Sequence, residues 1–169
     1  MTPRQDALKR ALELDAEHRS KEACAVLREA LEHDPHAPDV LPRLAYLLNR
    51  DGREDELLAL LGEHGRAVLE DPYLRLQRGE ALSSLGRHRE ARVDFVAVRA
   101  SGAPEPLRDR AQAFLDWTDQ ELASIDDALA ALGRARLCGA GGLVVLAGMC
   151  GAAWLLRRRQ RLLGPDGEG

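Results

Sequence analysis

Few residues in this sequence could do acid–base or metal chemistry, and those few lie apart. His33 and His36 fall in the segment LEHDPHAP, where Pro35 and Pro38 predict a turn between helices and not a pair of metal ligands. The other histidines, His18, His64 and His88, are isolated in polar surroundings and are expected to face solvent. The sequence has neither a glycine-rich phosphate loop nor a nucleophile elbow. We therefore expect no catalytic residue, no metal site and no cofactor, and we expect that the protein is not an enzyme.

The composition indicates an all-α protein. Of the 169 residues, 45% are hydrophobic and 31% are charged, but only 4% are aromatic. Such values are typical of long helices and helical repeats. β-Branched and aromatic residues never accumulate in alternating runs, so no β-sheet is predicted.

The charge is unevenly distributed along the chain. The tail from Arg157 to Gly169 carries four arginines against Asp166 and Glu168 and is therefore +2, and the stretch from Leu137 to Leu156 is uncharged. Because the whole chain is −4, residues 1–136 carry −6. An acidic domain without a basic stripe is a poor nucleic-acid binder, since phosphate neutralisation supplies most of that affinity. We expect no nucleic-acid partner.

Apolar residues recur at a step of 34 positions, the repeat period, which predicts repeated helix pairs. The columns are Ala11, Ala45, Gly79 and Ala113; Leu14, Leu48 and Leu82; Ala23, Leu57 and Ala91; and Leu27, Leu61 and Phe95. Small residues recur where helices approach closely, and large ones recur where a gap is filled. Gly52 and Gly86 are predicted to end first helices in a left-handed cap, and Pro35 and Pro72 follow the second helices.

These columns, together with the closing Asp-Pro, resemble the tetratricopeptide repeat family over roughly residues 4–104. The resemblance implies a right-handed superhelix of about three helix pairs, followed by a degenerate fourth unit or capping helix. The family's early aromatic residue is missing, and Leu57 replaces a small residue in the second unit. We expect helices near residues 4–17, 20–33, 39–50, 53–69, 72–85, 88–100 and 106–118, with another from 119 onward. Three extra residues in EHGRAVLEDP predict a lengthened second helix or turn in the second unit.

The resemblance also implies a concave groove, lined by the first helices, that receives an extended or helical peptide of a partner protein. The groove residues implied by position are Leu8, Leu12, Tyr46, Asn49, Arg50, Tyr73, Leu76 and Glu80. Tyrosine and arginine are enriched in binding hot spots, and Arg50 is a candidate anion contact. For the three leucines the alternative is that they complete the core. The clamp of Lys, Asn and Arg that grips a chaperone's C-terminal carboxylate is absent from the matching positions, so that subclass is not expected.

A transmembrane helix is predicted at residues 137–156, with membrane lipid as its surroundings. These 20 residues carry no charge, and a helix of that length spans about 30 Å, the thickness of a bilayer's hydrocarbon core. The alternative is a buried helix, but a helix that is apolar on every side needs a cover that this chain does not offer. The expected anchor residues are Leu143, Val144, Val145, Leu146, Trp154, Leu155 and Leu156, with Arg157, Arg158 and Arg159 among the headgroups. Small residues at four-residue spacing would allow a weak homodimer through this span.

The predicted organisation is therefore a repeat domain with a single-pass anchor. It comprises residues 1–104 as repeats, 105–136 as a degenerate repeat or capping helix, 137–156 as the transmembrane helix, and 157–169 as a basic, then glycine-rich tail. We expect insertion as a tail anchor, which leaves the repeats in the cytoplasm. The alternative, favoured by the arginines after the span, is a periplasmic or lumenal repeat domain with a cytoplasmic C-terminal tail. The expected function is a membrane-anchored adaptor or scaffold for a protein partner. The alternative is a structural or assembly subunit of a membrane complex.

Overall fold

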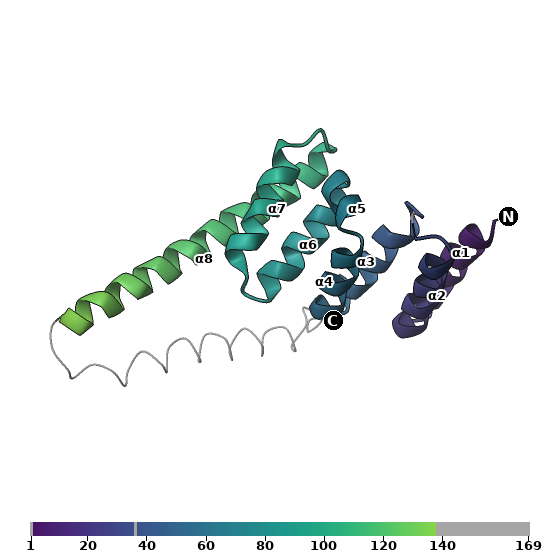
Figure 1. Cartoon of the computed structure of the whole chain (residues 1–169), viewed down its shortest axis with the longest axis horizontal. Coiled ribbons are helices and arrows are strands. Elements are labelled where there is room, and N and C mark those ends of the chain that lie inside the picture. The colour runs from purple at the N-terminus through teal and green to yellow at the C-terminus, as the bar shows by residue number, and fades with distance from the viewer. Residues whose placement is uncertain (1, 36, 138–169) are drawn as a thin grey trace, which may run out of the picture. The chain divides into compact units, whose positions relative to one another are not determined.

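A computed structural model of the chain describes residues 2–35 and 37–137. Within them the protein has eight helices and no strand (Figure 1). The helices are α1 (Pro3–Ala16), α2 (Ser20–His33), α3 (Val40–Arg50), α4 (Glu54–Glu63), α5 (Gly65–Glu70), α6 (Pro72–Ser84), α7 (His88–Ala100) and α8 (Glu105–Leu137). The chain divides into two units, Met1–Ala123 and Ser124–Gly169.

The first unit is built from three successive helix pairs, α1 with α2, α3 with α4, and α6 with α7 (Figure 1). Helix α3 packs on α2 and on α6, so neighbouring pairs bury one another's apolar faces. One core cluster extends from Ala11 in α1 to Ala81 in α6. A second cluster joins α6 and α7 to Ala111 and Leu115, in the first half of α8. Stacked units of this kind depend on their neighbours for burial.

The residues that recur at the repeat period are buried, with one exception. From Ala11 to Phe95, every member of the four columns lies in one of the two core clusters or, for Gly79, against Phe95. Ala113 is exposed, whereas Ala111, two positions before it, is fully buried. The repeat period therefore holds over the three helix pairs and fails in α8.

The first helix of each pair ends in the same turn. His18, Gly52 and Gly86 occupy equivalent positions of successive repeats and have φ values of 59°, 68° and 77°. The amide of the following residue donates to a leucine carbonyl five positions back, with N···O distances of 2.9, 2.9 and 2.8 Å at Arg19, Arg53 and Arg87. This bond, with the left-handed residue before it, defines the Schellman motif. The left-handed caps predicted at Gly52 and Gly86 are confirmed, and the third, at His18, was not predicted because it is not a glycine.

Two of the expected helices differ from the structure. The single helix expected near residues 53–69 is interrupted by a turn at His64, which separates α4 from α5, so of the two alternatives for the three extra residues the turn is the one that occurs. The expected boundary near residues 118 and 119 does not exist, because α8 runs without interruption from Glu105 to Leu137. No Pro or Gly occurs between Leu107 and Leu132 to end it.

The prediction of a fold with a transmembrane helix is contradicted. No helix in the described ranges combines the length and the apolar composition needed to cross a bilayer. Helix α8 is long, at 33 residues, but it carries charged side chains such as Glu121, Asp126 and Asp127 along its length. Over the described residues the fold class is therefore all-helical with no membrane-spanning helix, and the membrane localisation that rested on such a helix is dropped.

The predicted anchor residues lie outside the described part of the chain. These are Leu143, Val144, Val145, Leu146, Trp154, Leu155, Leu156, Arg157, Arg158 and Arg159. The basic tail from residue 157 to 169 lies outside it as well.

Two glycines in helices should respond oppositely to alanine. A Cβ on Gly79 would lie 2.7 Å from Cε1 of Phe95, whose fully buried ring is stacked on Phe114 and has little room to move. A Cβ on Gly62 in α4 would meet nothing within 4 Å. We predict that Gly79→Ala lowers the free energy of unfolding by about 1–3 kcal/mol through overpacking. Gly62→Ala should raise it by about 0.5–1 kcal/mol, the ordinary gain in a helix. Urea titration followed by circular dichroism measures both, and equal effects would contradict the close contact at Gly79.

The turn at His18 should be stabilised by glycine. A non-glycine residue in the left-handed region costs roughly 1–2 kcal/mol, although histidine tolerates it better than most. We predict that His18→Gly raises the free energy of unfolding by about 1 kcal/mol. Gly52→Ala and Gly86→Ala, at the equivalent positions, should lower it by a similar amount. A loss of stability in His18→Gly would show that the imidazole itself stabilises the fold.

Candidate functional site

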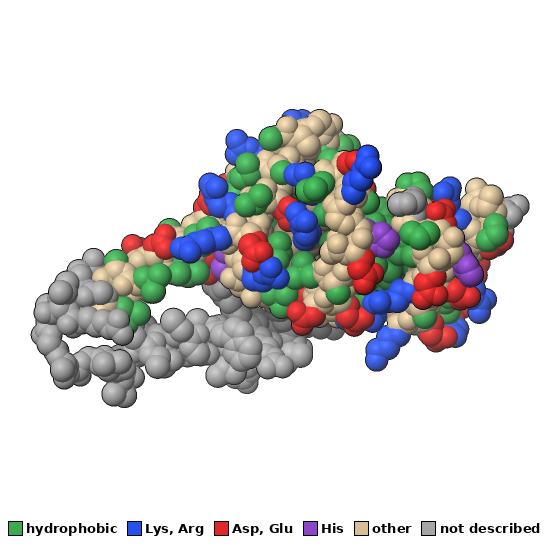
Figure 2. Space-filling model, in the orientation of Figure 1, with side chains coloured by type: hydrophobic (Ala, Val, Ile, Leu, Met, Phe, Trp, Pro, Cys, Tyr) green, Lys and Arg blue, Asp and Glu red, His purple; other side chains and the backbone are tan. Residues whose placement is uncertain are grey.

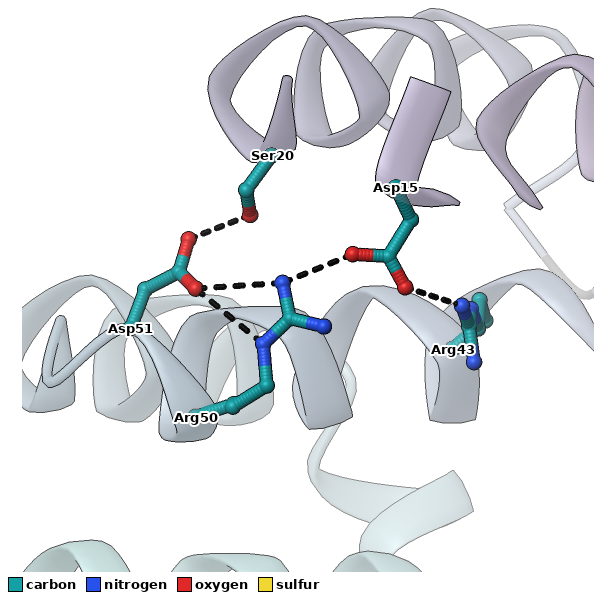
Figure 3. A network of polar contacts seen from close by, with 5 residues as sticks. All are labelled: Asp15, Ser20, Arg43, Arg50 and Asp51. Atoms are coloured by element: carbon teal, nitrogen blue, oxygen red, sulfur yellow. Dashed lines mark hydrogen bonds and ion pairs between the residues drawn. The ribbon is translucent and has the colours of Figure 1, made fainter. Parts of the chain in front are cut away.

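A network of charged side chains joins the first helix pair to the second (Figure 3). Asp15, at the end of α1, accepts from Arg43 at 2.6 Å and pairs with Arg50 at 2.7 Å, both from α3. Arg50 also reaches Asp51 at 3.3 Å, and the Ser20 hydroxyl donates to that same carboxylate from the start of α2. The network therefore fixes the register of α3 against both helices of the preceding pair.

The two arginines of this network also contact an aromatic ring. The guanidinium carbons of Arg43 and Arg50 lie 5.4 and 5.8 Å from the centroid of Tyr46. Cation–π contacts of this kind are worth about 0.5–1 kcal/mol at exposed sites. The hydrogen bond from Arg50 is the main reason that the pKa of Asp15 is lowered, with burial opposing the shift. Asp15 thus stays ionised and holds both guanidinium groups in place.

A pocket opens beside this network, between α3 and α6. It has a volume of about 320 Å³ and is lined by Pro42, Arg43, Tyr46 and Tyr73. Tyr46 is 37% exposed, whereas Tyr73 is half-buried, and burial raises the pKa of its phenol. Both rings present apolar faces with a polar tip. The pocket can therefore receive one apolar or aromatic side chain with a hydrogen-bonding group nearby.

The second and third helix pairs are joined by a different polar network. Asn49 of α3 donates from Nδ2 to Gln77 and to Glu80 of α6, both at 2.8 Å. Arg110 of α8 pairs with both oxygens of Glu80, at 2.8 and 3.0 Å. The guanidinium carbon of Arg110 lies 5.9 Å from the ring centroid of Phe114. Three helices are thus held by one carboxylate.

Burial dominates the electrostatics of Glu80. The residue is only 6% exposed, and the loss of hydration raises its pKa, while Arg110 and the bond from Asn49 act in the opposite direction. Arg110 is half exposed, so water still solvates its charge. The ion pair of Glu80 and Arg110 lies where α3, α6 and α8 meet, and Glu80 is on the same helix as Tyr73.

The contacts between successive pairs follow the repeat. Asp15 contacts Arg43, and Asn49 contacts Gln77, each across 28 residues. Both contacts join the end of one first helix to the next first helix, and the second contact lies one repeat period after the first. The chemistry changes from an ion pair to an amide pair, but the geometry is kept. Next along the chain, Ser83 lies 3.5 Å from Thr118 of α8.

The predicted groove residues separate into four groups. Tyr46, Asn49, Arg50 and Tyr73 meet at the networks and the pocket described above. Glu80 is in the same region but is buried and paired. Leu76 is fully buried in the second core cluster, and Leu8 packs partly buried against the first, so both serve the core. Leu12 is exposed.

Several buried or paired residues were not predicted, among them Arg43, Arg110 and His88. Arg43 lies 28 residues after Asp15, as Gln77 lies after Asn49, and this shared spacing is a signal that the repeat offered. Arg110 has no such signal, because α8 does not follow the repeat period. His88 was expected to face solvent, but it is buried and meets Trp117 of α8 edge to face, with ring centroids 5.4 Å apart.

The charged side chains of the site are paired with one another. Each of the three arginines at the site is engaged by a carboxylate. Within the described ranges no three His, Cys, Asp or Glu side chains are grouped so as to hold a metal ion. Comparison of the chain with protein-family models, with curated proteins and with solved structures gave no match.

Removing the buried charge of Glu80 should change the pH dependence of stability. Because the folded state raises the pKa of Glu80, stability from this group is lost as the pH rises through that folded-state value and is fully present below the unfolded value near 4.5. We predict that the wild type gains stability relative to Glu80→Gln on acidification, by about 1.4 kcal/mol for each unit between the two pKa values. At neutral pH the variant should fold normally, since Arg110 remains solvated.

Asp15→Asn provides the matched control, with the opposite sign. The folded state lowers the pKa of Asp15, so the wild type should lose stability relative to this variant as the pH falls through that lowered value. Urea unfolding of the three proteins between about pH 2 and pH 8 measures both trends, since the loss at Asp15 falls below its unfolded value of 3.8. Parallel curves for the wild type and Glu80→Gln would contradict the raised pKa.

Proposed function

We propose that this protein is an interaction adaptor built of tetratricopeptide-like helix pairs, which binds a peptide or a helical segment of a partner protein along α1, α3 and α6. The proposal is supported by the equal turns at His18, Gly52 and Gly86 and by the equivalent contacts between successive first helices. Both place equivalent residues of successive first helices against one another. A regular row of helices is the kind of surface that an elongated ligand can follow.

The observation that carries the proposal is the pocket between α3 and α6. Its walls are two tyrosines, a proline and an arginine, and its volume of about 320 Å³ is at the small end of ligand pockets. Tyrosine and arginine anchors in such pockets account for a large share of binding energy at protein interfaces. The ring of Tyr46 is held by Arg43 and Arg50, so little side-chain entropy is lost there on binding.

A second candidate is a structural subunit of a larger assembly, favoured by one feature of α8. Ile125, Leu129 and Leu132 are exposed and lie at a spacing of four and three residues, which puts them on one face of the helix. Such a stripe is typical of a helix that packs on another helix. A permanent partner at this stripe would make the protein part of a fixed complex and not a recruiter of peptides.

The groove can be tested by peptide selection. We predict that peptides selected on the full chain from a random display library bind Tyr73→Ala at least about tenfold more weakly, because the variant removes one wall of the pocket. Tyr46→Ala should have a similar effect. The helical circular dichroism signal should be unchanged, since Tyr73 is outside both core clusters.

Leu69→Ala is the matched control for this experiment. Leu69 is also a large exposed apolar residue, but it lies on α5 and outside the pocket. Equal binding by Tyr73→Ala and the wild type would place the interface elsewhere, and loss of binding by Leu69→Ala would do the same.

A further inference from the structure

The second helices of successive pairs are joined by an arginine–glutamate contact at the first interface. Arg28 of α2 donates to Oε2 of Glu56 in α4 at 2.7 Å. The same Oε2 accepts from Arg53 at 2.7 Å, while Oε1 of Glu56 accepts from Arg53 at 2.8 Å. One carboxylate thus binds two guanidinium groups, one from its own helix start and one from the preceding pair.

The equivalent position of the second interface lacks the second guanidinium. Arg87 and Glu90 repeat the pair of Arg53 and Glu56 in the next repeat, with both N···O distances at 2.7 Å. The residue equivalent to Arg28, however, is Gly62. A Cβ on Gly62 would meet no atom within 4 Å, so no neighbour has moved in to occupy the space.

That space is a pocket of about 420 Å³. Its lining residues come from α4, α6 and α7, with Arg87 directly before α7. They are Leu58, Gly62, Arg78, Leu82, Arg87, Glu90, Val93 and Asp94. Figure 2 shows basic, acidic and hydrophobic side chains interspersed over α4, α6 and α7, consistent with this mixed lining. Leu58, Leu82 and Val93 supply apolar walls, and Glu90 supplies an exposed carboxylate.

The charges around the pocket are paired so that the carboxylate of Glu90 can accept a second cation. Arg78 is held by both oxygens of the buried Asp94, at 2.7 and 2.5 Å, so this pair is neutral and fixed. Arg87 donates to both oxygens of Glu90, as Arg53 donates to both oxygens of Glu56. At the first interface the equivalent carboxylate still accepts a second guanidinium, which shows that this geometry is feasible within the same fold.

We infer that the pocket at Gly62 and Glu90 is a binding site for an arginine side chain of a partner protein. The methylene stem of that arginine would lie against Leu58, Leu82 and Val93, and its guanidinium would donate to Glu90 in the way that Arg28 donates to Glu56. Arginine suits the site because a planar guanidinium can share a carboxylate with a second guanidinium and its stem covers apolar surface. The site is lined by α4, α6 and α7 and shares no residue with the tyrosine pocket, so it does not rest on the proposed groove function.

The test uses a capped arginine, N-acetyl-arginine N-methylamide, titrated into the ¹⁵N-labelled full chain and followed by NMR. We expect saturable shifts at Gly62, Glu90 and their neighbours, with a Kd on the order of 1–10 mM for so small a probe. Capped citrulline, the neutral isostere, should bind at least about tenfold more weakly. Capped glutamate should not compete. Equal binding of citrulline, preferential binding of glutamate, or no shifts at about 50 mM probe would each overturn the inference.

Three variants locate the site. Gly62→Arg places the missing side chain in the pocket, so it should abolish binding of the probe, and Glu90→Gln should weaken it about tenfold or more. Glu56→Gln makes the same change at the occupied interface and should leave probe binding unchanged. Unaltered binding in Gly62→Arg, or equal losses in Glu90→Gln and Glu56→Gln, would contradict the assignment.

A stability measurement keeps the test independent of the probe. Gly62→Arg and Gly62→Gln both gain helix propensity, but only arginine can pair with Glu90. We expect a higher Tm for Gly62→Arg than for Gly62→Gln, and we expect that difference to vanish when Glu90→Gln is added. A difference that persists in the Glu90→Gln background would show that Glu90 does not receive the guanidinium.

Discussion

The fold depends on the left-handed turn that ends each first helix. At His18, Gly52 and Gly86 the chain reverses within a few residues, and the amide that follows bonds back to the leucine carbonyl five positions earlier. That bond sets the angle at which the second helix leaves the first. Because the same turn recurs once in every repeat, each first helix hands the chain to its second helix through the same backbone conformation.

Regular stacking explains why polar contacts between pairs also repeat. Once the pairs are equivalent, a side chain near the end of one first helix meets the same position of the next. Asp15 with Arg43, and Asn49 with Gln77, are two chemical solutions at one geometric position. Arg28 with Glu56, and Gly62 with Glu90, are likewise two states of one position on the second helices, one filled and one open. Differences between equivalent positions, more than the repeated features, are therefore where this chain acquires specific surfaces.

Much of the first unit could be predicted because its signals are local. The repeat period, the apolar columns and the glycine caps are all properties of short segments, and they predicted the helix pairs and the turns at Gly52 and Gly86 correctly. The left-handed turn at His18 was not predicted because the residue in that conformation is not a glycine. The continuity of α8 was predictable from the absence of Pro and Gly between Leu107 and Leu132, although a boundary was expected there. His88 and Arg110 could not have been assigned, because their partners, Trp117 and Glu80, come from elements distant in sequence and α8 leaves the register of the repeat.

Helix α6 has a property that follows from its position between the two core clusters. Leu74 and Ala81 belong to the first cluster, and Leu76 and Leu82 belong to the second, while Gln77, Gly79, Glu80 and Ser83 are buried as well. The helix is thus enclosed on nearly every side, although it is not apolar throughout. Amides in α6 should exchange with solvent only when both clusters open, whereas those in α1 need only the first to open. The slowest-exchanging backbone of the first unit therefore lies in its middle. Loss of either end of the unit would destabilise the other end, because α6 belongs to both core clusters.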